Sequence, residues 1–285
     1  MQRKKIWLDY DQNDLDAQYD NQRTVADYDA IMREWAQASA NARAISEVKA
    51  DLIYEAHPRA RIDFYPAKRG GPAMIFFHGG FWRSFDKTGL AFLAPAFTSA
   101  GISIAFPNYP LAPEASLATI VQHACRSVSW VIDHVEELHI DRANIWLAGH
   151  SAGAHLAVMA AGAAPEEFDL RGCCAISGIY DLQPIRLSYL NKTLHLSEVE
   201  VVACSPINLK PKVPCLITAV GEKETDEFRR QTGGLTALAR TSGCVLQDNL
   251  LPDTDHYEAV RTLARPNDPF FEQIASVILS DKASA

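Results

Sequence analysis

The sequence lacks the long apolar runs of membrane-spanning and secreted proteins and the excess positive charge of nucleic-acid-binding proteins. No apolar run approaches the ~20 residues that a membrane-spanning helix needs. The basic stretch 1–5 is followed by aspartates rather than by the apolar segment of a signal peptide. Positive charge is also in deficit, since the 285 residues carry a formal net charge of -8, which argues against nucleic acid or a membrane surface as partner. We therefore expect a cytoplasmic protein with a small-molecule substrate, and leave open whether it forms a homodimer.

The cysteine pattern lacks the signatures of a disulfide framework or a zinc site. None of the six cysteines forms a C-x-x-C pair, and no Cys/His cluster has the spacing of zinc ligands. We expect free thiols in a reducing compartment, no bound metal and no cofactor. Cys173 and Cys174 are neighbours in an apolar run, and we expect them to face opposite sides of a strand.

From about residue 62, short β-rich runs alternate with longer amphipathic stretches. This alternation predicts an α/β fold with a mostly parallel central sheet and helices on both faces. Continuous apolar runs such as 74–77 are typical of strands that are covered on both sides. The expected strands are 62–65, 73–77, 102–106, 144–148, 173–177, 215–220 and 245–250, and the expected helices are 87–99, 115–138, 152–163, 228–241 and 270–279.

Two segments stand apart from this alternation within what we expect to be one domain over residues 1–285. Residues 1–45 are acidic and then helical in pattern, with Ile31, Trp35 and Ala38 at helix spacing, which predicts an N-terminal helical extension. The segment of about 181–209 has no clean period and falls between two strands. It is expected to form a small lid or cap near the active-site loops.

The strongest chemical motif is Gly149-His150-Ser151-Ala152-Gly153, a G-x-S-x-G pattern. It follows a predicted strand and opens a predicted helix, which is the setting of the nucleophile elbow in the α/β-hydrolase fold. The tight turn needs small flanking residues and presents a serine hydroxyl at the edge of the sheet. We interpret Ser151 as a nucleophile; the alternative is an ordinary Gly-Ser turn.

A second motif, His78-Gly79-Gly80-Phe81-Trp82, directly follows the predicted strand 73–77. Paired glycines let backbone N–H groups turn towards a substrate carbonyl, as an oxyanion hole requires. In these hydrolases the amide after the nucleophile is a further donor. The predicted oxyanion hole therefore comprises the amides of Gly80, Phe81 and Ala152.

A serine nucleophile needs a base, and the base needs an orienting acid. In this fold the chain order is serine, acid, histidine. His256 is the histidine that follows the last predicted strand, so it is the predicted base. The acid is expected in the turn after strand 215–220, where four carboxylates compete: Glu222, Glu224, Asp226 and Glu227.

These motifs together resemble the serine-dependent kynurenine formamidases (arylformamidases), relatives of the hormone-sensitive-lipase-like esterases. Residues 78–82 look like the family's H-G-G-x-W, and 15–23 look like its N-terminal L-x-x-x-Y-N-x-R. Segments 177–182, 205–206 and 221–231 are also similar, so the resemblance covers nearly the whole chain. It implies that Glu224 is the triad acid, at a position where the family usually has aspartate.

The resemblance implies hydrolysis of a small acyl amide or ester through an acyl-enzyme, with N-formylkynurenine as the leading substrate. The alternatives are a short-chain carboxylesterase or an amidase on another metabolite, and a non-catalytic binding module. Trp82 and Tyr180 are predicted walls of an aromatic substrate pocket, the alternative being that they belong to the core. Arg83, Ser84 and Asn108 are candidate anchors for a polar substrate tail.

Overall fold

A central β-sheet organises the chain in a computed structural model that describes residues 4–67, 69–209 and 212–280. Its strand order is β1-β2-β4-β3-β5-β6-β7-β8. The strands are β1 (Lys49–Ile53), β2 (Arg61–Tyr65), β3 (Gly71–Phe77), β4 (Ser103–Pro107), β5 (Ile140–His150), β6 (Gly172–Ile176), β7 (Cys215–Gly221) and β8 (Val245–Leu251). Strands β3 to β8 pair in parallel, and β1 and β2 add an antiparallel edge. The predicted α/β-hydrolase architecture, with a mostly parallel sheet, is confirmed.

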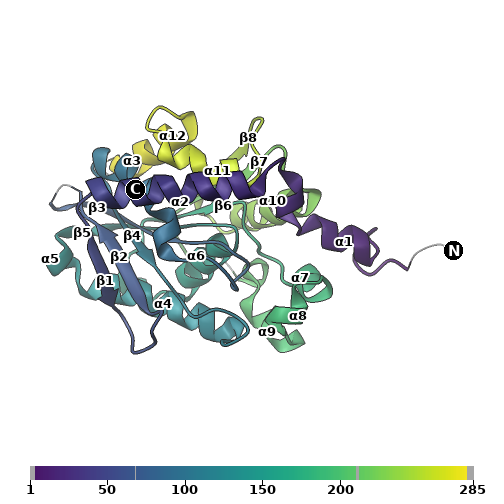
Figure 1. The fold of residues 1–285 in the computed structure, drawn as a ribbon. Helices are drawn as coiled ribbons and strands as arrows, with labels where there is room; N and C mark the ends of the chain where they lie inside the picture. The colour runs from purple at the N-terminus through teal and green to yellow at the C-terminus, as the bar shows by residue number, and fades with distance from the viewer. Residues whose placement is uncertain (1–3, 68, 210–211, 281–285) are drawn as a thin grey trace.

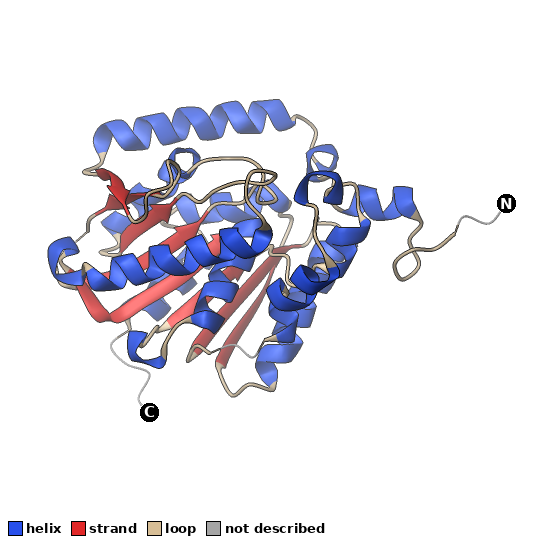
Figure 2. Cartoon of the chain, turned by 90° about the horizontal axis from the view of Figure 1, so that it is seen from below, coloured by secondary structure: helices blue, strands red, loops and turns tan. Residues whose placement is uncertain are grey.

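Helices cover both faces of this sheet (Figures 1 and 2). They are α1 (Gln12–Gln18), α2 (Tyr28–Ile45), α3 (Ala94–Ser99), α4 (Leu117–Asp133), α5 (Val135–Leu138), α6 (Ala152–Ala163), α7 (Gln183–Leu187), α8 (Asn191–Leu194), α9 (Glu198–Cys204), α10 (Asp226–Arg240), α11 (His256–Arg261) and α12 (Pro269–Leu279). Residues of α4, α6 and α10 pack in the core on one face, and those of α3, α11 and α12 pack on the other. Among these described residues, no helix has the length and apolarity to cross a membrane.

Successive side chains of the buried strands pack alternately into two separate hydrophobic cores, one on each face of the sheet. Cys173 packs in the core beneath α4 and α6, whereas Cys174 packs in the core beneath α3 and α12. The predicted opposite orientation of these two thiols is therefore confirmed, because successive side chains of a strand point to opposite faces. All six cysteines are free.

The edge of the sheet departs from the predicted strands. Strand β1 is half-exposed, and its sequence Lys-Ala-Asp-Leu-Ile lacks the apolar run by which the inner strands were predicted. An edge strand needs one hydrogen-bonded neighbour and little burial, so its pattern is weak. The expected helix 87–99 is divided into a 3₁₀ segment, η2 (Lys87–Leu93), and α3.

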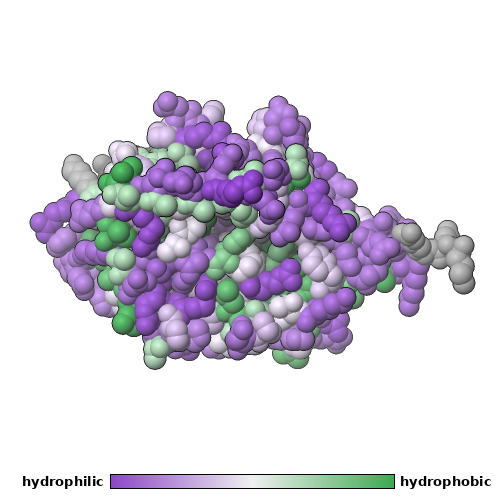
Figure 3. Space-filling model, viewed as in Figure 1, coloured by the Kyte–Doolittle hydropathy of each residue, from purple (hydrophilic) through white to green (hydrophobic). Residues whose placement is uncertain are grey.

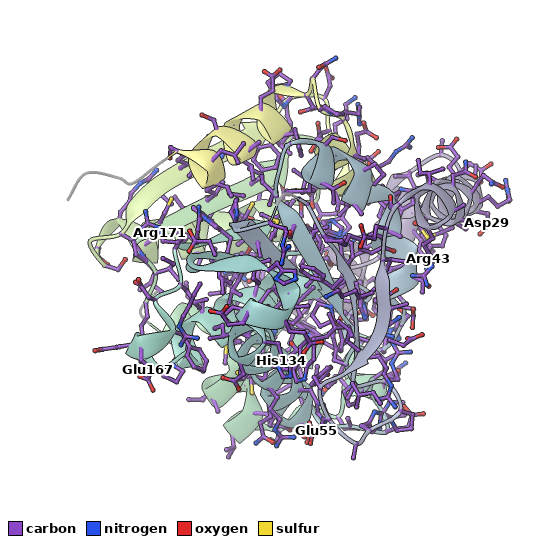
Figure 4. The ribbon with its side chains drawn as sticks, turned by 90° about the vertical axis from the view of Figure 1, so that its left-hand side faces the viewer. Asp29, Arg43, Glu55, His134, Glu167 and Arg171 are labelled. Carbon is purple, nitrogen blue, oxygen red and sulfur yellow. The ribbon has the colours of Figure 1, made fainter. Side chains whose placement is uncertain are left out.

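The N-terminal extension lies across the face of the molecule above the sheet. Helix α2 runs along η2 and is the long purple helix of Figure 1. Asp27 caps its first turn by accepting a hydrogen bond from the Ala30 amide at 2.8 Å. Near its other end, Arg43 reaches Asp63 of β2, which in turn accepts a hydrogen bond from Lys87 Nζ at 2.6 Å. Figure 4 labels Asp29 and Arg43 on this helix at one side of the molecule.

Candidate active site

Ser151 occupies the sharp turn between β5 and α6. Its backbone is strained, with φ at 58° and ψ at -124°, a conformation that L residues rarely adopt. The flanking glycines are required by close backbone contact. A Cβ at Gly149 would lie 2.2 Å from the Gly153 carbonyl oxygen, and one at Gly153 would lie 2.0 Å from the Phe77 carbonyl oxygen. The G-x-S-x-G spacing thus allows the elbow to pack directly on β3.

The loop that follows β3 lies against the same turn. A Cβ at Gly79 would be 3.2 Å from the Ser151 Cβ, which places the loop in contact with the elbow. Gly80, Phe81 and Trp82 all have positive φ, at 100°, 48° and 56°.

Three backbone amides around this contact have no partner in the part of the chain that the structure describes. The N–H groups of Gly80, Phe81 and Ala152 donate no hydrogen bond within residues 4–67, 69–209 and 212–280. Ala152 stands at the first position of α6, where a helix leaves its N–H groups unsatisfied. These amides are free to donate to a ligand.

His256 and Glu224 meet at the carboxyl ends of β7 and β8. His256 Nδ1 lies 2.7 Å from Glu224 Oε2, and both residues are about 95% buried, at 4% and 5% exposure. The other oxygen, Oε1, accepts from the Ser177 hydroxyl at 2.5 Å and from the Gly221 amide at 2.8 Å. The carboxylate is thus held by donors at both oxygens.

Backbone contacts bring the acidic turn and the histidine loop together. The Lys223 amide donates to the Thr254 carbonyl at 2.9 Å, and the Glu222 amide donates to the Leu251 carbonyl at 2.9 Å. A Cβ at Gly221 would lie 2.3 Å from the Thr254 oxygen, so only glycine permits this approach.

The other carboxylates of the turn face elsewhere. Asp226 pairs with Arg229, and Glu222 accepts from the Asp253 amide at 3.0 Å. Glu227 is buried and accepts from Tyr19 Oη at 2.8 Å and from Arg230. Among the four candidates, Glu224 is therefore the one that contacts His256.

Two further histidines support this arrangement without a net charge. His150 Nε2 donates to the His256 carbonyl at 2.8 Å, and burial holds its pKa well below the ordinary value. His78 donates from Nδ1 to the Gly79 carbonyl at 2.8 Å and stacks on Tyr109. Burial lowers the pKa of His78 to about 4.

Sequence reasoning missed Ser177 as a hydrogen-bond partner of Glu224. It is fully buried, has φ at 50°, and follows β6, the strand between the elbow strand and the acid strand. The available signal was a polar residue directly after an apolar run. The distance between Ser177 and Glu224 depends on the order of the strands in the sheet, which cannot be deduced from the sequence.

Ser151 and His256 line a common cavity of about 360 Å³. The N-terminal extension contributes seven of the 23 residues of its wall, and the 181–209 segment contributes Tyr189. The aromatic residues of the wall are Tyr19, Tyr28, Trp35, Phe81, Phe85, Tyr189 and Tyr257. The segment 78–90 supplies the largest share of the wall, and the N-terminal extension supplies the next largest. On the outside, the face carrying α2 is mostly hydrophilic, with hydrophobic residues in small groups (Figure 3).

The prediction that Trp82 and Tyr180 form walls of the pocket needs correction. Both side chains are fully buried, and neither lines the cavity. Trp82 turns into the core, where its Nε1 donates to His155 Nδ1 at 3.2 Å. Tyr180 packs against Gly178, at which a Cβ would lie 2.2 Å from the Tyr180 hydroxyl oxygen. Of the candidate tail anchors, Arg83 and Ser84 line the cavity, whereas Asn108 is buried and bonds to the Lys87 amide and Asp86.

Comparison with known proteins agrees with this geometry. A family model described as the alpha/beta hydrolase fold matches residues 74–204, which include both glycine motifs. This protein is a hydrolase of the α/β-hydrolase fold. Its predicted resemblance to the kynurenine formamidases is also confirmed. The hydrolase is 28% identical to the kynurenine formamidase of Danio rerio over 92% of its own length and 94% of that protein.

Other relatives of this hydrolase are esterases by name. It is 32% identical to a probable isoprenylcysteine alpha-carbonyl methylesterase of Arabidopsis thaliana, over 39% of its own length and 24% of that protein. A Silicibacter protein provisionally named a thioesterase superposes with a TM-score of 0.82 at 25% identity, covering 93% of this chain and 99% of that one. An esterase of Pyrobaculum calidifontis shares the fold, with a TM-score of 0.71, 20% identity and coverage of 87% and 92%.

Proposed function

We propose that this hydrolase cleaves a small N-formyl aryl amide, with N-formylkynurenine as the substrate and kynurenine and formate as products. The observation that carries the proposal is the similarity to kynurenine formamidases over nearly the full length of both chains. The cavity supports it. At about 360 Å³ it is near the lower end for ligand pockets, and its aromatic walls suit an aryl group.

In the proposed mechanism, Ser151 Oγ attacks the formyl carbon while His256 accepts the hydroxyl proton through Nε2. Glu224 holds the imidazole through Nδ1 and stabilises the imidazolium that forms. The amides of Gly80, Phe81 and Ala152 receive the oxyanion, and each such donor contributes roughly 3–4 kcal/mol to lowering the barrier.

Collapse of this intermediate breaks the C–N bond, and His256 returns the proton to the departing aniline nitrogen. Water, deprotonated by His256, then attacks the formyl ester on Ser151. Formate leaves and the serine hydroxyl is restored. The neutral His150 supports this cycle because its Nε2 donates to the His256 backbone without placing a second charge beside the imidazolium.

A short-chain carboxylesterase is the second candidate function. The observation that favours it is the set of esterases among the structural neighbours. The same serine, base and oxyanion amides cleave either bond, so the distinction depends on the leaving group rather than on the machinery.

For the cell compartment, the six free cysteines support a reducing cytoplasm as the site of action. A homodimer stays an open expectation from the sequence.

Steady-state kinetics on N-formylkynurenine and phenyl acetate test the proposal. The expected result is a kcat/KM for the formamide at least equal to that for the ester. If the protein cleaves the ester rapidly but barely turns over the formamide, the formamidase proposal is wrong and the esterase proposal takes its place.

The Ser151→Ala variant is the control for contaminating activity. Its rate should fall by about 10⁴-fold or more on either substrate. A wild-type protein that cleaves neither substrate and does not react with a fluorophosphonate would be a binding module instead.

A further inference from the structure

The cavity wall contains little formal charge. Among the described residues that line it, Arg83 and Asp86 are the members of the Lys, Arg, Asp and Glu classes. Both come from the loop that follows the His78–Trp82 motif. A carboxylate and a guanidinium in one small cavity raise the question of which is available to a ligand.

Asp86 is occupied by the protein itself. One oxygen accepts from the Thr88 amide and the Thr88 hydroxyl, each at 3.0 Å. The other accepts from Asn108 Nδ2 at 2.6 Å and lies 3.6 Å from Arg59. Its hydrogen bonds cap the start of η2, so its role is structural.

Arg83 has no such partner. Within the described residues, no carboxylate lies within ion-pair distance of its guanidinium. Its contacts are a long hydrogen bond of 3.4 Å to Thr193 Oγ1 and the ring face of Tyr189, 5.8 Å from the guanidinium carbon. Burial raises the pKa of Tyr189, so neither contact supplies a negative charge at neutral pH. A guanidinium has five N–H donors, and most of these stay available.

The position of Arg83 ties it to the reacting centre. Its amide donates to the Gly80 carbonyl at 3.0 Å, in the loop whose amides are the proposed oxyanion donors. The ring of Tyr189, which also lines the cavity, lies against the guanidinium. Because the formyl group is the smallest acyl group, a substrate reaching Arg83 from Ser151 does so through its leaving group.

Electrostatics favours an anion at this point. The whole chain carries a formal net charge of -8, which repels an anionic substrate over long range. A local cation offsets that repulsion, and the planar fork of arginine matches a carboxylate with two parallel hydrogen bonds.

We propose that Arg83 binds a free carboxylate on the leaving group, so that the substrates are acylated anilines or phenols that bear a carboxylate. The inference rests on the proposed function, in which the amino-acid tail of N-formylkynurenine supplies this group. Arg83 is a substrate-binding residue here, and takes no part in the bond-breaking steps.

The test compares acids with their neutral counterparts in wild-type protein, Arg83→Met and Arg83→Lys. The substrate pairs are N-formylkynurenine with its methyl ester, and 3-acetoxybenzoate with phenyl acetate. Methionine keeps a long apolar stem and removes the charge. Lysine keeps the charge and removes the fork. Lys192→Met is the matched control, because Lys192 is an exposed cation beside Thr193 that does not line the cavity.

We expect Arg83→Met to lower kcat/KM for the two acids by about 10- to 100-fold, mainly through KM, as loss of a hydrogen-bonded charge predicts. The neutral substrates should change less than threefold, Arg83→Lys should be intermediate, and Lys192→Met should resemble wild type. Equal losses on acids and neutral substrates, or no loss on the acids, would overturn the inference. If wild type fails on N-formylkynurenine while Arg83→Met still loses activity only on 3-acetoxybenzoate, the formamidase proposal fails and the carboxylate site stands.

Discussion

Glu224 and Asp226 stand two residues apart in one turn, yet their side chains meet different surroundings. Glu224 is buried and accepts from Ser177 and Gly221 while it holds His256. Asp226 begins α10 and pairs with Arg229 in solvent. Exposed pairs of this kind contribute little, whereas the buried contact between Glu224 and His256 is the one that we expect to matter for turnover.

The acid prediction is tested by three substitutions. Glu224→Gln should lower kcat by about 10³- to 10⁴-fold, because an amide cannot stabilise the imidazolium. Asp226→Asn and Glu222→Gln should change kcat less than about threefold. The measurement is kcat on the best aryl substrate, with thermal unfolding as a control for folding. A larger loss in either neighbour than in Glu224→Gln would move the acid within the turn.

Ser177 is expected to position the acid rather than to contact substrate. Ser177→Ala removes the 2.5 Å hydrogen bond to Glu224 Oε1 and keeps the volume of the buried site. A hydrogen bond to a charged group is worth about 1.5–3 kcal/mol, so kcat should fall roughly 10- to 100-fold.

The readout that separates positioning from folding is the split between kcat and KM. KM should stay within about twofold, since Ser177 does not line the cavity. Combined with Glu224→Gln, the serine substitution should cost little more, because the two act through one contact. Additive losses would show that Ser177 acts independently of the acid.

At the scale of elements, helix α2 was predicted only as part of an N-terminal helical extension, yet it forms part of the cavity wall. Tyr28, Met32, Trp35 and Ala36 of this helix all line the cavity. The 181–209 segment, predicted as the lid, forms α7, α8 and α9 and contributes one residue to the wall. The N-terminal extension therefore contributes more residues to the cavity wall than the 181–209 segment does.

The role of α2 is tested by placing a bulky side chain on either of two faces. Ala36 is exposed and lines the active-site cavity, whereas Ala38 is exposed and lines a separate groove between α2 and the C-terminal helices. Ala36→Phe should lower kcat/KM for aryl substrates roughly tenfold, by occupying space the substrate needs. Ala38→Phe is the control, with unchanged kinetics.

Thermal unfolding of both variants should match that of wild type, since both positions face solvent. Equal kinetic losses in the two variants would mean that α2 influences the site through its packing and not through the cavity wall.

At the scale of the whole molecule, buried neutral histidines make stability depend on pH. Burial lowers the pKa of His78 and of His155 to about 4. In His155, Nδ1 accepts from Trp82 and Nε2 donates to the Cys204 carbonyl at 2.7 Å, so there is no place for a second proton. The unfolded chain binds these protons near pH 6.5. The contribution of these two histidines to the free energy of unfolding is therefore fully present above about pH 6.5. It is lost as the pH falls towards 4.

We expect the free energy of unfolding to fall on the order of 2 kcal/mol per histidine between pH 8 and pH 5. Urea unfolding at several pH values measures it. His155→Gln keeps an acceptor and a donor but cannot titrate, and should remove its share of the slope. His139→Gln, at an exposed turn, is the control for replacing a histidine by glutamine. A stability that is flat from pH 8 to pH 5 would contradict the buried neutral state.

The sequence alone determined the parts of this protein that depend on local pattern. Apolar runs marked the inner strands, and the glycines around Ser151 and after His78 marked turns that only glycine allows. Helix 152–163 was predicted at its observed bounds, and the tight turn at Ser151 marks its first residue. These signals need only near neighbours in the chain.

Tertiary structure decided what depends on distance between remote segments. It placed Glu224, of the four carboxylates, in contact with His256, brought Ser177 to the same carboxylate, and made α2 part of the cavity wall. It also sent Trp82 and Tyr180 into the core and left Arg83 on the wall. The sequence does not distinguish an aromatic side chain of the core from one of a pocket wall, because burial of apolar surface is favourable in both places. Only strand order and the packing of the cap determine which of the two surrounds it.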